Sequence, residues 1–363
     1  MSIDLSKMPK IGFGLMRLPE NDGVIDIDKV SKMADSYLEA GFTYFDTAYV
    51  YHGGNSEKAV KEAIVKRHPR DSFTLATKLP AWFIHSLEDR DKLFNEQLDR
   101  CGVDFFDFYL LHSIEDGNNY EIYEKYDCFN WGIQKKAEGK IRHFGFSYHG
   151  TPELLVQIQL NYIDWDNPIV HSGELYKILS ERNIPIIVME PCKGGKLANL
   201  DDECASNLKA IHPDKSVASW AFRFVASLPG VATILSGMST EDQMADNMNT
   251  FKNFEPLSDE EKAAIGKVVE AMSRVELIGC TACKYCVEGC PMGISIPDVI
   301  SAINTARKFP GDMRPQFFYN GLVDRYSHAS DCIGCGQCEG VCPQHLPIIT
   351  LMQEAVEKFE KKG

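Results

Sequence analysis

Eight of the twelve cysteines in this chain lie near its C-terminal end, in two copies of one spacing. Each copy reads C-x2-C-x2-C-x3-C and is followed by a proline. The first copy contains Cys280, Cys283, Cys286 and Cys290, and the second contains Cys332, Cys335, Cys338 and Cys342. In this run, three closely spaced thiolates hold one 4Fe–4S cubane, and the fourth thiolate usually binds a second cluster. The spacing therefore predicts two clusters and single-electron chemistry.

A single copy of this motif could be a zinc site or a coincidence. Two identical copies, each with its proline (Pro291 and Pro343), make coincidence negligible. Structural zinc sites use pairs of cysteines rather than this four-cysteine run. The long segment between the motifs includes a helix-like run over residues 297–308. We therefore expect a small, mainly helical ferredoxin-like module rather than a mostly β one.

A second set of reactive side chains lies in the first third of the chain. Asp46, Lys78 and His112 each end an apolar run, and Tyr51 follows Asp46 by five residues. Singly, each has an ordinary explanation, because a carboxylate can cap a turn, a lysine can extend to solvent and a histidine can be a core residue. Whether they act together depends on the fold that the apolar runs form.

The apolar runs resemble strands buried on both faces, and amphipathic segments lie between most of them. The expected strands cover residues 11–18, 42–47, 73–78, 106–112, 141–147, 156–162, 184–189 and 231–236. The expected helices cover residues 26–40, 56–67, 87–101, 120–138, 172–182, 215–227 and 241–250. Eight such units over about 250 residues predict an α/β fold, the TIM (β/α)8 barrel, in which catalytic groups lie at the C-terminal ends of the strands.

Two domains follow from this pattern. The barrel is expected over residues 1–257, and a linker helix with the ferredoxin-like domain over residues 258–363. Ser258 and Glu261 have the capping-box spacing that starts such a helix.

One connection does not fit a regular barrel. About eight residues separate the expected fifth and sixth strands, whereas a parallel crossover normally needs a dozen or more. Either the barrel is distorted here, or a segment is missing between residues 150 and 156. Because both flanking strands have normal sequences, we favour the missing segment.

Asp46, Tyr51, Lys78 and His112 match, in type, order and strand-end position, the catalytic tetrad of the aldo-keto reductase family. The sequence also resembles this family at residues 12–17, 55–57 and 139–147. The resemblance covers roughly residues 10 to 250. With its two cysteine motifs, the chain is similar to the subgroup of aldo-keto reductase-like oxidoreductases that carry a C-terminal 4Fe–4S domain. This resemblance implies a small carbonyl or alcohol substrate.

The implied tetrad suits carbonyl reduction. Hydride arriving at a carbonyl carbon builds negative charge on the oxygen, which then needs an acid within hydrogen-bond reach. Tyr51 is expected to be that acid, and the Lys78 ammonium is expected to lower its pKa. Asp46 would keep Lys78 charged and oriented, and His112 would orient the carbonyl.

The chain has no G-x-G-x-x-G run opening a βαβ unit, so a Rossmann domain is not indicated. The resemblance instead implies NADP or NAD extended over the barrel mouth. The implied cofactor residues are Gly14, Met16, Asp46, Ser147, Gln157, Met189, Gly194, Gly195, Ser236, Gly237, Met238, Ser239, Gln243 and Asn247.

Each group of these residues has an implied role. Ser147 and Gln157 match positions that bind the carboxamide, and Met189 stands where many members place a stacking aromatic. Residues 192–197 resemble the loop along the pyrophosphate, where glycines allow close approach and lysines supply charge. The turn at residues 236–240 begins a helix whose N-terminus can bind phosphate. Relatives that prefer NADP often have a cation in this turn, where this chain has Ser239, Thr240 and Glu241. The hydroxyls could still bind a 2′-phosphate, but the missing cation argues against a strong preference for NADP.

Composition excludes several partners. The net charge of −14 argues against nucleic acids and anionic membranes. No apolar run approaches a membrane span, and residues 1–9 lack the apolar core of a signal peptide. Because cluster-binding cysteines must be reduced thiols, a cytoplasmic location is expected.

Two hypotheses remain at this point. Either the chain is a reductase with an attached cluster domain, or it is an electron-transfer or redox-sensing protein whose barrel does not reduce carbonyls. Nicotinamide passes two electrons as hydride, whereas a cluster passes one. The clusters could therefore serve a separate redox partner protein, sense redox state or stabilise the module.

Overall fold

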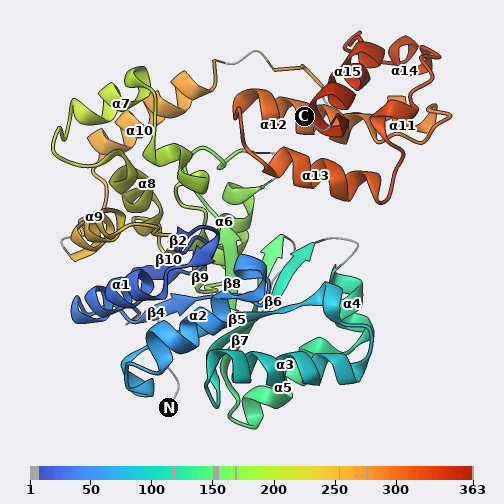
Figure 1. The fold of residues 1–363 in the computed structure, drawn as a ribbon. Coiled ribbons are helices and arrows are strands. Elements are labelled where there is room, and N and C mark those ends of the chain that lie inside the picture. The colour runs from blue at the N-terminus through green and yellow to red at the C-terminus, as the bar shows by residue number, and fades with distance from the viewer. Residues whose placement is uncertain are drawn as a thin grey trace. The chain divides into compact units, whose positions relative to one another are not determined.

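The computed structural model describes residues 8–115, 119–149, 155–167, 170–252, 254–274, 277–280 and 282–361. The chain separates into two compact units, Met1–Gly266 and Lys267–Gly363 (Figure 1). This boundary falls inside helix α10 (Asp259–Met272), the helix expected to start after Ser258. The domain limits at residues 257 and 258 stay a prediction.

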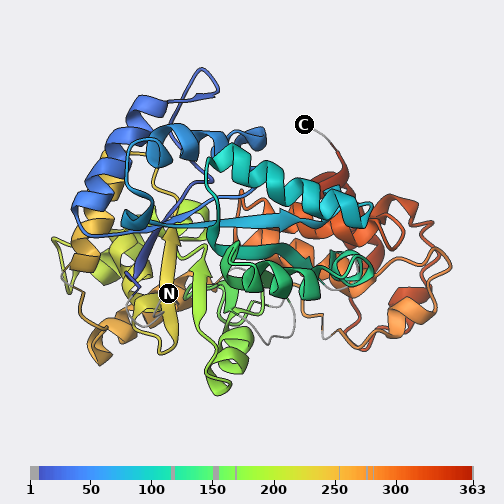
Figure 2. The ribbon, with the colours of Figure 1, turned by 90° about the horizontal axis from the view of Figure 1, so that it is seen from below.

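The first unit is built on a closed barrel of eight strands. They are β1 (Ile11–Gly14), β4 (Tyr44–Asp46), β5 (Thr74–Pro80), β6 (Phe106–Glu115), β7 (Ile141–His149), β8 (Leu155–Gln159), β9 (Ile186–Met189) and β10 (Val231–Ser236). Neighbouring strands are parallel throughout, in the order β1-β10-β9-β8-β7-β6-β5-β4. The predicted TIM barrel is thus confirmed, and Figure 2 shows its helices outside the strands. A short hairpin, β2 (Glu20–Asn21) and β3 (Val24–Ile25), was not predicted.

The helices of the first unit lie between most of the strands along the chain, and one follows the last strand. They are α1 (Ile27–Glu39), α2 (Ser56–Val60), α3 (Leu87–Cys101), α4 (Asn119–Lys125), α5 (Cys128–Ala137), α6 (Ser172–Glu181), α7 (Asp202–Lys209), α8 (Val217–Ala226) and α9 (Glu241–Lys252). Helix α7 was not predicted, and the helix expected over residues 120–138 is two helices because Asp127 has a left-handed φ of 49°. None of the helices in the described part of the chain is long and apolar enough to cross a membrane.

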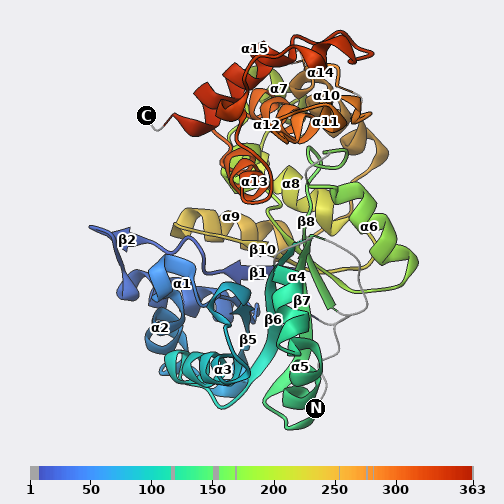
Figure 3. The ribbon, with the colours of Figure 1, turned by 90° about the vertical axis from the view of Figure 1, so that its right-hand side faces the viewer.

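Capping residues fix where these helices begin and end. The Asp26 side chain accepts a hydrogen bond from the Lys29 N–H before α1, and Ser86 does the same for Asp89 before α3. Helix α3 ends at Gly102, whose φ of 71° a residue with a Cβ rarely adopts. Helices α3 and α5 lie outside β5 to β7 (Figure 3).

The two ends of the barrel have different chemistry. At the N-terminal ends of the strands, the fully buried Asp107 carboxylate accepts hydrogen bonds from Arg70 at 2.6 Å, Arg142 at 2.7 Å and the Leu75 N–H at 2.9 Å. Both guanidinium groups flank Phe105, at 4.0 and 4.2 Å from its ring centre. A buried carboxylate with three hydrogen-bond donors at this end of a barrel serves stability, since catalytic groups lie at the other end.

The short connection between β7 and β8 joins neighbouring parallel strands. Ser147 lies opposite Gln157, and Gly145 lies opposite Leu155. Residues 150–154 lie outside the described residues, so the suggestion of a missing segment stays a prediction.

The second unit is helical, as predicted. Its helices are α11 (Tyr285–Glu288), α12 (Ile296–Lys308), α13 (Arg314–Val323), α14 (Gln337–Gly340) and α15 (Ile348–Ala355). Apolar residues of α12, α13 and α15, including Ile300, Ile303, Tyr319, Leu351 and Met352, form its core. The short helices α11 and α14 each contain one cysteine of a motif.

Candidate active site and cluster cradles

The four tetrad residues meet at the C-terminal end of the barrel. Asp46 ends β4, Lys78 lies in β5, and His112 lies in β6, and these three strands are neighbours in the barrel. Tyr51 opens the short turn Tyr51–Gly54 that follows β4. The structure thus brings together all four residues that the sequence singled out.

A buried ion pair lies at the centre of this group. Lys78 Nζ donates to Asp46 Oδ1 at 2.6 Å and to the Thr47 carbonyl at 2.8 Å, and both charged side chains are 2% exposed. Gln97, from α3, donates to the Lys78 carbonyl at 3.0 Å. A buried charge pair is stable only when such hydrogen bonds satisfy its remaining atoms. The network therefore fixes the position of the ammonium.

The pKa values of this group depend on burial and on mutual charge. Burial would lower the pKa of Lys78, but the Asp46 carboxylate and the Tyr51 hydroxyl raise it above its ordinary value. Burial raises the pKa of Tyr51, and the Lys78 ammonium only partly reverses this. The sequence argument expected a lowered pKa for Tyr51. It stays raised because burial and the Asp46 charge outweigh Lys78.

His112 completes the polar side of the site. Its ring is 6.1 Å from the Tyr51 ring and nearly perpendicular to it, and 5.3 Å from the ring of Trp82. Burial and the Lys78 charge lower the pKa of His112 to about 3, so its imidazole is neutral at physiological pH. Its buried Nδ1 has no hydrogen-bond partner among the described residues.

His52, the residue after Tyr51, fixes the conformation of the turn through its side-chain hydrogen bonds. His52 has a left-handed φ of 52°, and its Nε2 accepts the Leu18 N–H at 2.9 Å. Its Nδ1 lies 2.6 Å from Glu20 Oε1, so the ring proton is on Nδ1 and is donated to the carboxylate. Sequence reasoning missed His52. The two glycines that follow it were the available sign of a left-handed turn.

The residues implied for the carboxamide lie beside the tetrad. Ser147 and Gln157 are opposite each other on β7 and β8, and both are buried. Gln157 Nε2 donates to Asp46 Oδ2 at 3.4 Å, whereas its buried Oε1 has no partner within the described part of the chain. Met189 ends β9 and packs against the apolar interior of the barrel. An unpaired amide oxygen at this depth fits a ligand that donates an N–H.

The loop after β9 has the expected glycine conformations, but one of its lysines does not face the expected pyrophosphate site. Gly194 and Gly195 have φ values of 67° and 95°, as close backbone approach requires. Lys193, however, points inward, where Nζ lies 2.6 Å from Asp164 Oδ1 and both side chains are at most 1% exposed. Lys193 therefore fixes the loop and does not offer its charge to a ligand. No sequence pattern indicated Asp164, because it lies in an irregular segment between β8 and α6.

The turn between β10 and α9 contains the remaining implied cofactor residues. Asn247 donates to Ser236 Oγ at 2.9 Å, and Ser239 N–H donates to Gln243 Oε1 at 2.8 Å. Met238 is buried below the turn, Gly237 is exposed, and Met16, which follows the neighbouring strand β1, is 53% exposed. Gly14 lies under the turn, where an added Cβ would be 3.4 Å from the Ser236 carbonyl oxygen.

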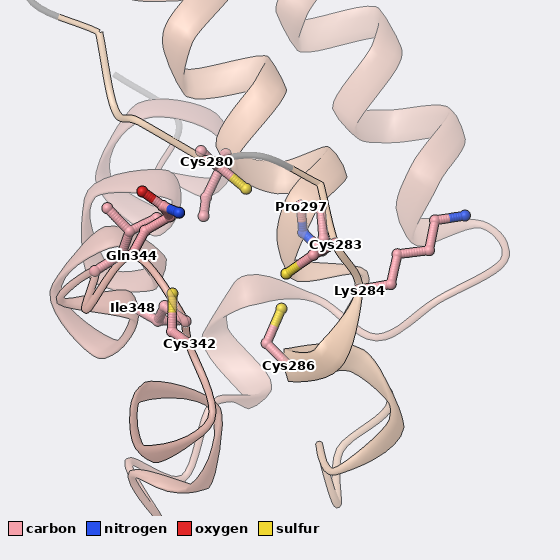
Figure 4. Close-up of a pocket in the computed structure, with 10 residues that line it drawn as sticks. Cys280, Cys283, Lys284, Cys286, Pro297, Cys342, Gln344 and Ile348 are labelled. Carbon is pink, nitrogen blue, oxygen red and sulfur yellow. The ribbon is translucent and has the colours of Figure 1, made fainter.

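The cysteines of the second unit form two cradles, each with four thiols. Cys280, Cys283 and Cys286 line the first cradle together with Cys342, the last cysteine of the other motif. Figure 4 shows these four sulfur atoms pointing toward a common space. Cys332, Cys335 and Cys338 line the second cradle together with Cys290. The fourth cysteine of each motif has thus crossed to the other cradle, as the motif predicts.

The cradles fit iron–sulfur cubanes better than single metal ions. Among the described residues, no three His, Cys, Asp or Glu side chains converge as ligands of one ion would. A cubane binds each thiolate at a different iron, so its ligands surround a larger space. Ile300, Leu346 and Ile348 line the first cradle, and Ile294, Ile296 and Met352 line the second. Soft thiolates in apolar surroundings match this donor set.

Comparison with known proteins agrees with this geometry. Residues 10–270 match the Aldo/keto reductase family, and residues 279–346 match the 4Fe-4S dicluster domain. An uncharacterized oxidoreductase of Bacillus subtilis is 25% identical over 72% of this chain and 92% of its own length. L-galactose dehydrogenase of Arabidopsis thaliana is 25% identical over 75% of this chain and 91% of its own length.

A solved structure shares the barrel fold. An aldo/keto reductase from Klebsiella pneumoniae, in complex with NADP and acetate, superimposes with a TM-score of 0.58 at 21% identity. The match covers 74% of this chain and 95% of the Klebsiella chain. The barrel, the matched residues and the two thiol cradles lead to one conclusion: this chain is an oxidoreductase that belongs to the aldo/keto reductase family and has a C-terminal 4Fe-4S dicluster domain.

Proposed function

We propose that the barrel reduces a small aldehyde or ketone with NADPH or NADH, or oxidises the corresponding alcohol in reverse. The observation that supports this most directly is the buried Lys78–Asp46 pair beside Tyr51, with a neutral His112 whose ring lies 6.1 Å from the phenol ring. Burying two charges is costly, and these two are held next to a tyrosine and a histidine that can move and orient a proton.

Each tetrad residue has a role in this proposal. A bound nicotinamide supplies the hydride. The Tyr51 hydroxyl gives its proton to the carbonyl oxygen as negative charge develops there. The Lys78 ammonium then stabilises the phenolate that Tyr51 becomes, and Asp46 keeps the ammonium charged and in place. The neutral His112 imidazole can donate an N–H to the same carbonyl oxygen and so orient it.

The proposed cofactor contacts follow the barrel mouth. Gln157 Oε1 and Ser147 would bind the carboxamide, Met189 would pack on the ring, and Gly194 with Gly195 would lie along the diphosphate. Glu241 and Asp242 lie in the first turn of α9, directly after the turn implied to bind phosphate. Their negative charge favours NADH over NADPH, because like charges repel and only NADPH carries a 2′-phosphate.

We further propose that the eight motif cysteines hold two 4Fe–4S clusters. Apolar surroundings and four thiols in each cradle support this. The clusters would exchange single electrons with a redox partner protein, since hydride transfer in the barrel moves two electrons together.

Anaerobically purified protein tests the proposal. It is expected to contain about eight irons per chain and to oxidise NADH or NADPH when small aldehydes or ketones are added. Iron and sulfide are counted first, and nucleotide oxidation is then followed by absorbance. Protein with its full iron content that binds neither nucleotide would refute the reductase and leave an electron-transfer role.

The rate of reduction is expected to depend little on pH between about pH 6 and pH 9. His112 stays neutral in this range because its pKa is about 3, and Tyr51 keeps its proton because burial raises its pKa. The measurement is kcat/KM against pH for the wild type and for His112→Gln. If kcat/KM of the wild type changes between pH 6 and pH 9, and this change disappears in His112→Gln, the imidazole is not neutral as assigned.

A further inference from the structure

The β2–β3 hairpin is not a part of the barrel sheet, yet one of its side chains reaches the turn that contains Tyr51. Glu20 lies on β2, and its Oε1 is 2.6 Å from Nδ1 of His52, the residue after Tyr51. The base of the hairpin is fixed, because the Asp26 N–H donates to the Pro19 carbonyl at 2.9 Å. Glu20 is therefore presented to His52 from a defined position.

The contact between the hairpin and the turn is not part of a packed core. Glu20 and His52 both line a cavity of about 270 Å³ between the hairpin and helix α2, together with Val24, Lys58 and Ala59. The Glu20 side chain is 40% exposed, whereas that of His52 is 9% exposed. Side chains that line a cavity have packing partners on one side only, so the hydrogen bond is the specific link between Glu20 and the turn.

The partners of His52 determine which of its ring nitrogens carries the proton. A neutral imidazole has one donor nitrogen and one acceptor nitrogen. The Leu18 N–H can only donate, and it donates to Nε2 at 2.9 Å, so Nε2 is the acceptor. The Glu20 carboxylate accepts the proton of Nδ1. Without this carboxylate the proton could move to Nε2, where it would face the Leu18 N–H instead of binding it.

The bond to Leu18 holds the middle of the turn. His52 and the two glycines after it have left-handed φ values of 52°, 60° and 88°. Apart from the Tyr51 hydroxyl, His52 is the residue of the turn that forms hydrogen bonds with a distant part of the chain, among the residues that the structure describes. Strained backbone persists only where surrounding contacts impose it. The His52 bond therefore affects where the phenol lies relative to Lys78, whose Nζ is 5.0 Å from the ring centre.

We propose that His52 and Glu20 are positioning residues for the Tyr51 proton donor. Glu20 keeps the ring proton of His52 on Nδ1, Nε2 then accepts the Leu18 N–H, and this bond holds the turn so that the phenol stays beside Lys78. The inference rests on the proposed function, because it requires Tyr51 to be the acid. Neither residue belongs to the tetrad or to the proposed cofactor contacts, so their loss should lower kcat and leave nucleotide affinity unchanged.

The first test replaces His52 in the cluster-loaded protein and measures kcat for reduction of a small aldehyde and Kd for NADH. His52→Leu is expected to lower kcat about tenfold or more, because a small misplacement of a catalytic group is costly. His52→Gln should keep kcat within about threefold of the wild type, since an amide can accept the Leu18 N–H and donate to Glu20. Both variants keep a Cβ at the same left-handed φ, so they differ in hydrogen bonding and not in backbone strain. Kd should be unchanged in both.

The second test separates the position of the proton from the charge of Glu20. Glu20→Gln keeps an oxygen that can accept the Nδ1 proton and should leave kcat within about twofold of the wild type. Glu20→Leu has no acceptor and should lower kcat about fivefold. Because Glu20 is partly exposed, this pair tests the proposal even if His52→Leu does not fold. If Glu20→Gln is as slow as Glu20→Leu, or both are as fast as the wild type, the role of Glu20 is overturned.

A double variant distinguishes positioning from a general loss of structure. His52→Leu is combined with Tyr51→Phe, and the residual kcat is compared with that of Tyr51→Phe alone. If His52 acts through the phenol hydroxyl, the added substitution changes little, because no hydroxyl is left to position. A further fall of about tenfold would show that His52 acts on the structure of the site in general, and would overturn the proposal.

A matched histidine pair elsewhere serves as the control. His68 Nε2 lies 2.8 Å from Asp35 Oδ1, in the segment that precedes β5. His68→Leu and Asp35→Leu remove the same kinds of group away from Tyr51, so kcat should equal that of the wild type. If His52→Leu keeps wild-type kcat and Tyr51→Phe is slow, the positioning role fails and the proposed function stands. If Tyr51→Phe also keeps wild-type kcat, the proposed acid fails and the positioning role fails with it.

Discussion

Replacing Tyr51 with phenylalanine is expected to lower kcat for carbonyl reduction about a thousandfold, within the range seen for loss of a general acid. The phenol is the group that lies beside both Lys78 and His112, so its removal leaves the developing oxyanion without a proton donor. Nucleotide binding should change little, since the Gln157 and Ser147 side chains do not depend on this hydroxyl. The measurement is kcat and the NADH dissociation constant of the same preparation.

Tyr49→Phe is the matched control for this variant. It removes the same atom two residues away, where the Tyr49 hydroxyl faces Glu96 and Arg100 on the outside of the barrel. Its kcat should equal that of the wild type. Wild-type kcat in Tyr51→Phe, with every carbonyl tested, would refute the proposed acid.

Sequence alone could place the tetrad because a barrel imposes a strict geometry. Asp46, Lys78 and His112 follow continuously apolar runs, and parallel strands in a barrel bring such positions to one end. Residues that are far apart along the chain could therefore be predicted to lie close together. The cysteine motifs were predictable for a related reason, since three of four ligands lie within one short turn-rich segment.

The contacts between loops could not be predicted in this way. Arg17 with Glu190, and Lys193 with Asp164, pair residues from irregular segments that have no hydrophobic period to set their direction. Lys193 shows the consequence. Its position suggested a charge for the cofactor, but a left-handed φ of 49° accompanies a side chain that points into the protein.

The direction of the Tyr51 pKa shift was also beyond the sequence. A neighbouring lysine favours the phenolate, whereas burial favours the neutral phenol, and their balance depends on how closely the surrounding side chains exclude water. In the structure burial is the larger effect. Tyr51 is therefore suited to remain a proton donor, which agrees with its proposed role in reduction.

The crossed arrangement of the thiols gives the sharpest test of the second unit. Cys342 lies in the cradle of the first motif, and Cys290 lies in the cradle of the second. A starting variant that lacks the first three thiols is needed, in which Cys280, Cys283 and Cys286 are all alanine. This variant is expected to keep about four irons per chain, held by the second cradle.

Adding Cys342→Ala or Cys290→Ala to that variant should then have different effects on its iron content. Cys342→Ala should leave its iron content unchanged, because this thiol belongs to the cradle that has already lost its other three ligands. Cys290→Ala should remove most of the remaining iron, or convert the cluster to a form with fewer irons, because it takes away one of four ligands. Iron and sulfide counting and electron paramagnetic resonance under anaerobic conditions separate these outcomes.

A second starting variant keeps the test valid if the first one does not fold. If the first variant contains no iron at all, Cys332, Cys335 and Cys338 are replaced instead. There Cys290→Ala should be harmless and Cys342→Ala should remove the surviving cluster. If each motif instead held its own cluster with all four of its cysteines, both patterns would be reversed. Reversal in both backgrounds would show that the thiols do not cross, whatever the state of the barrel.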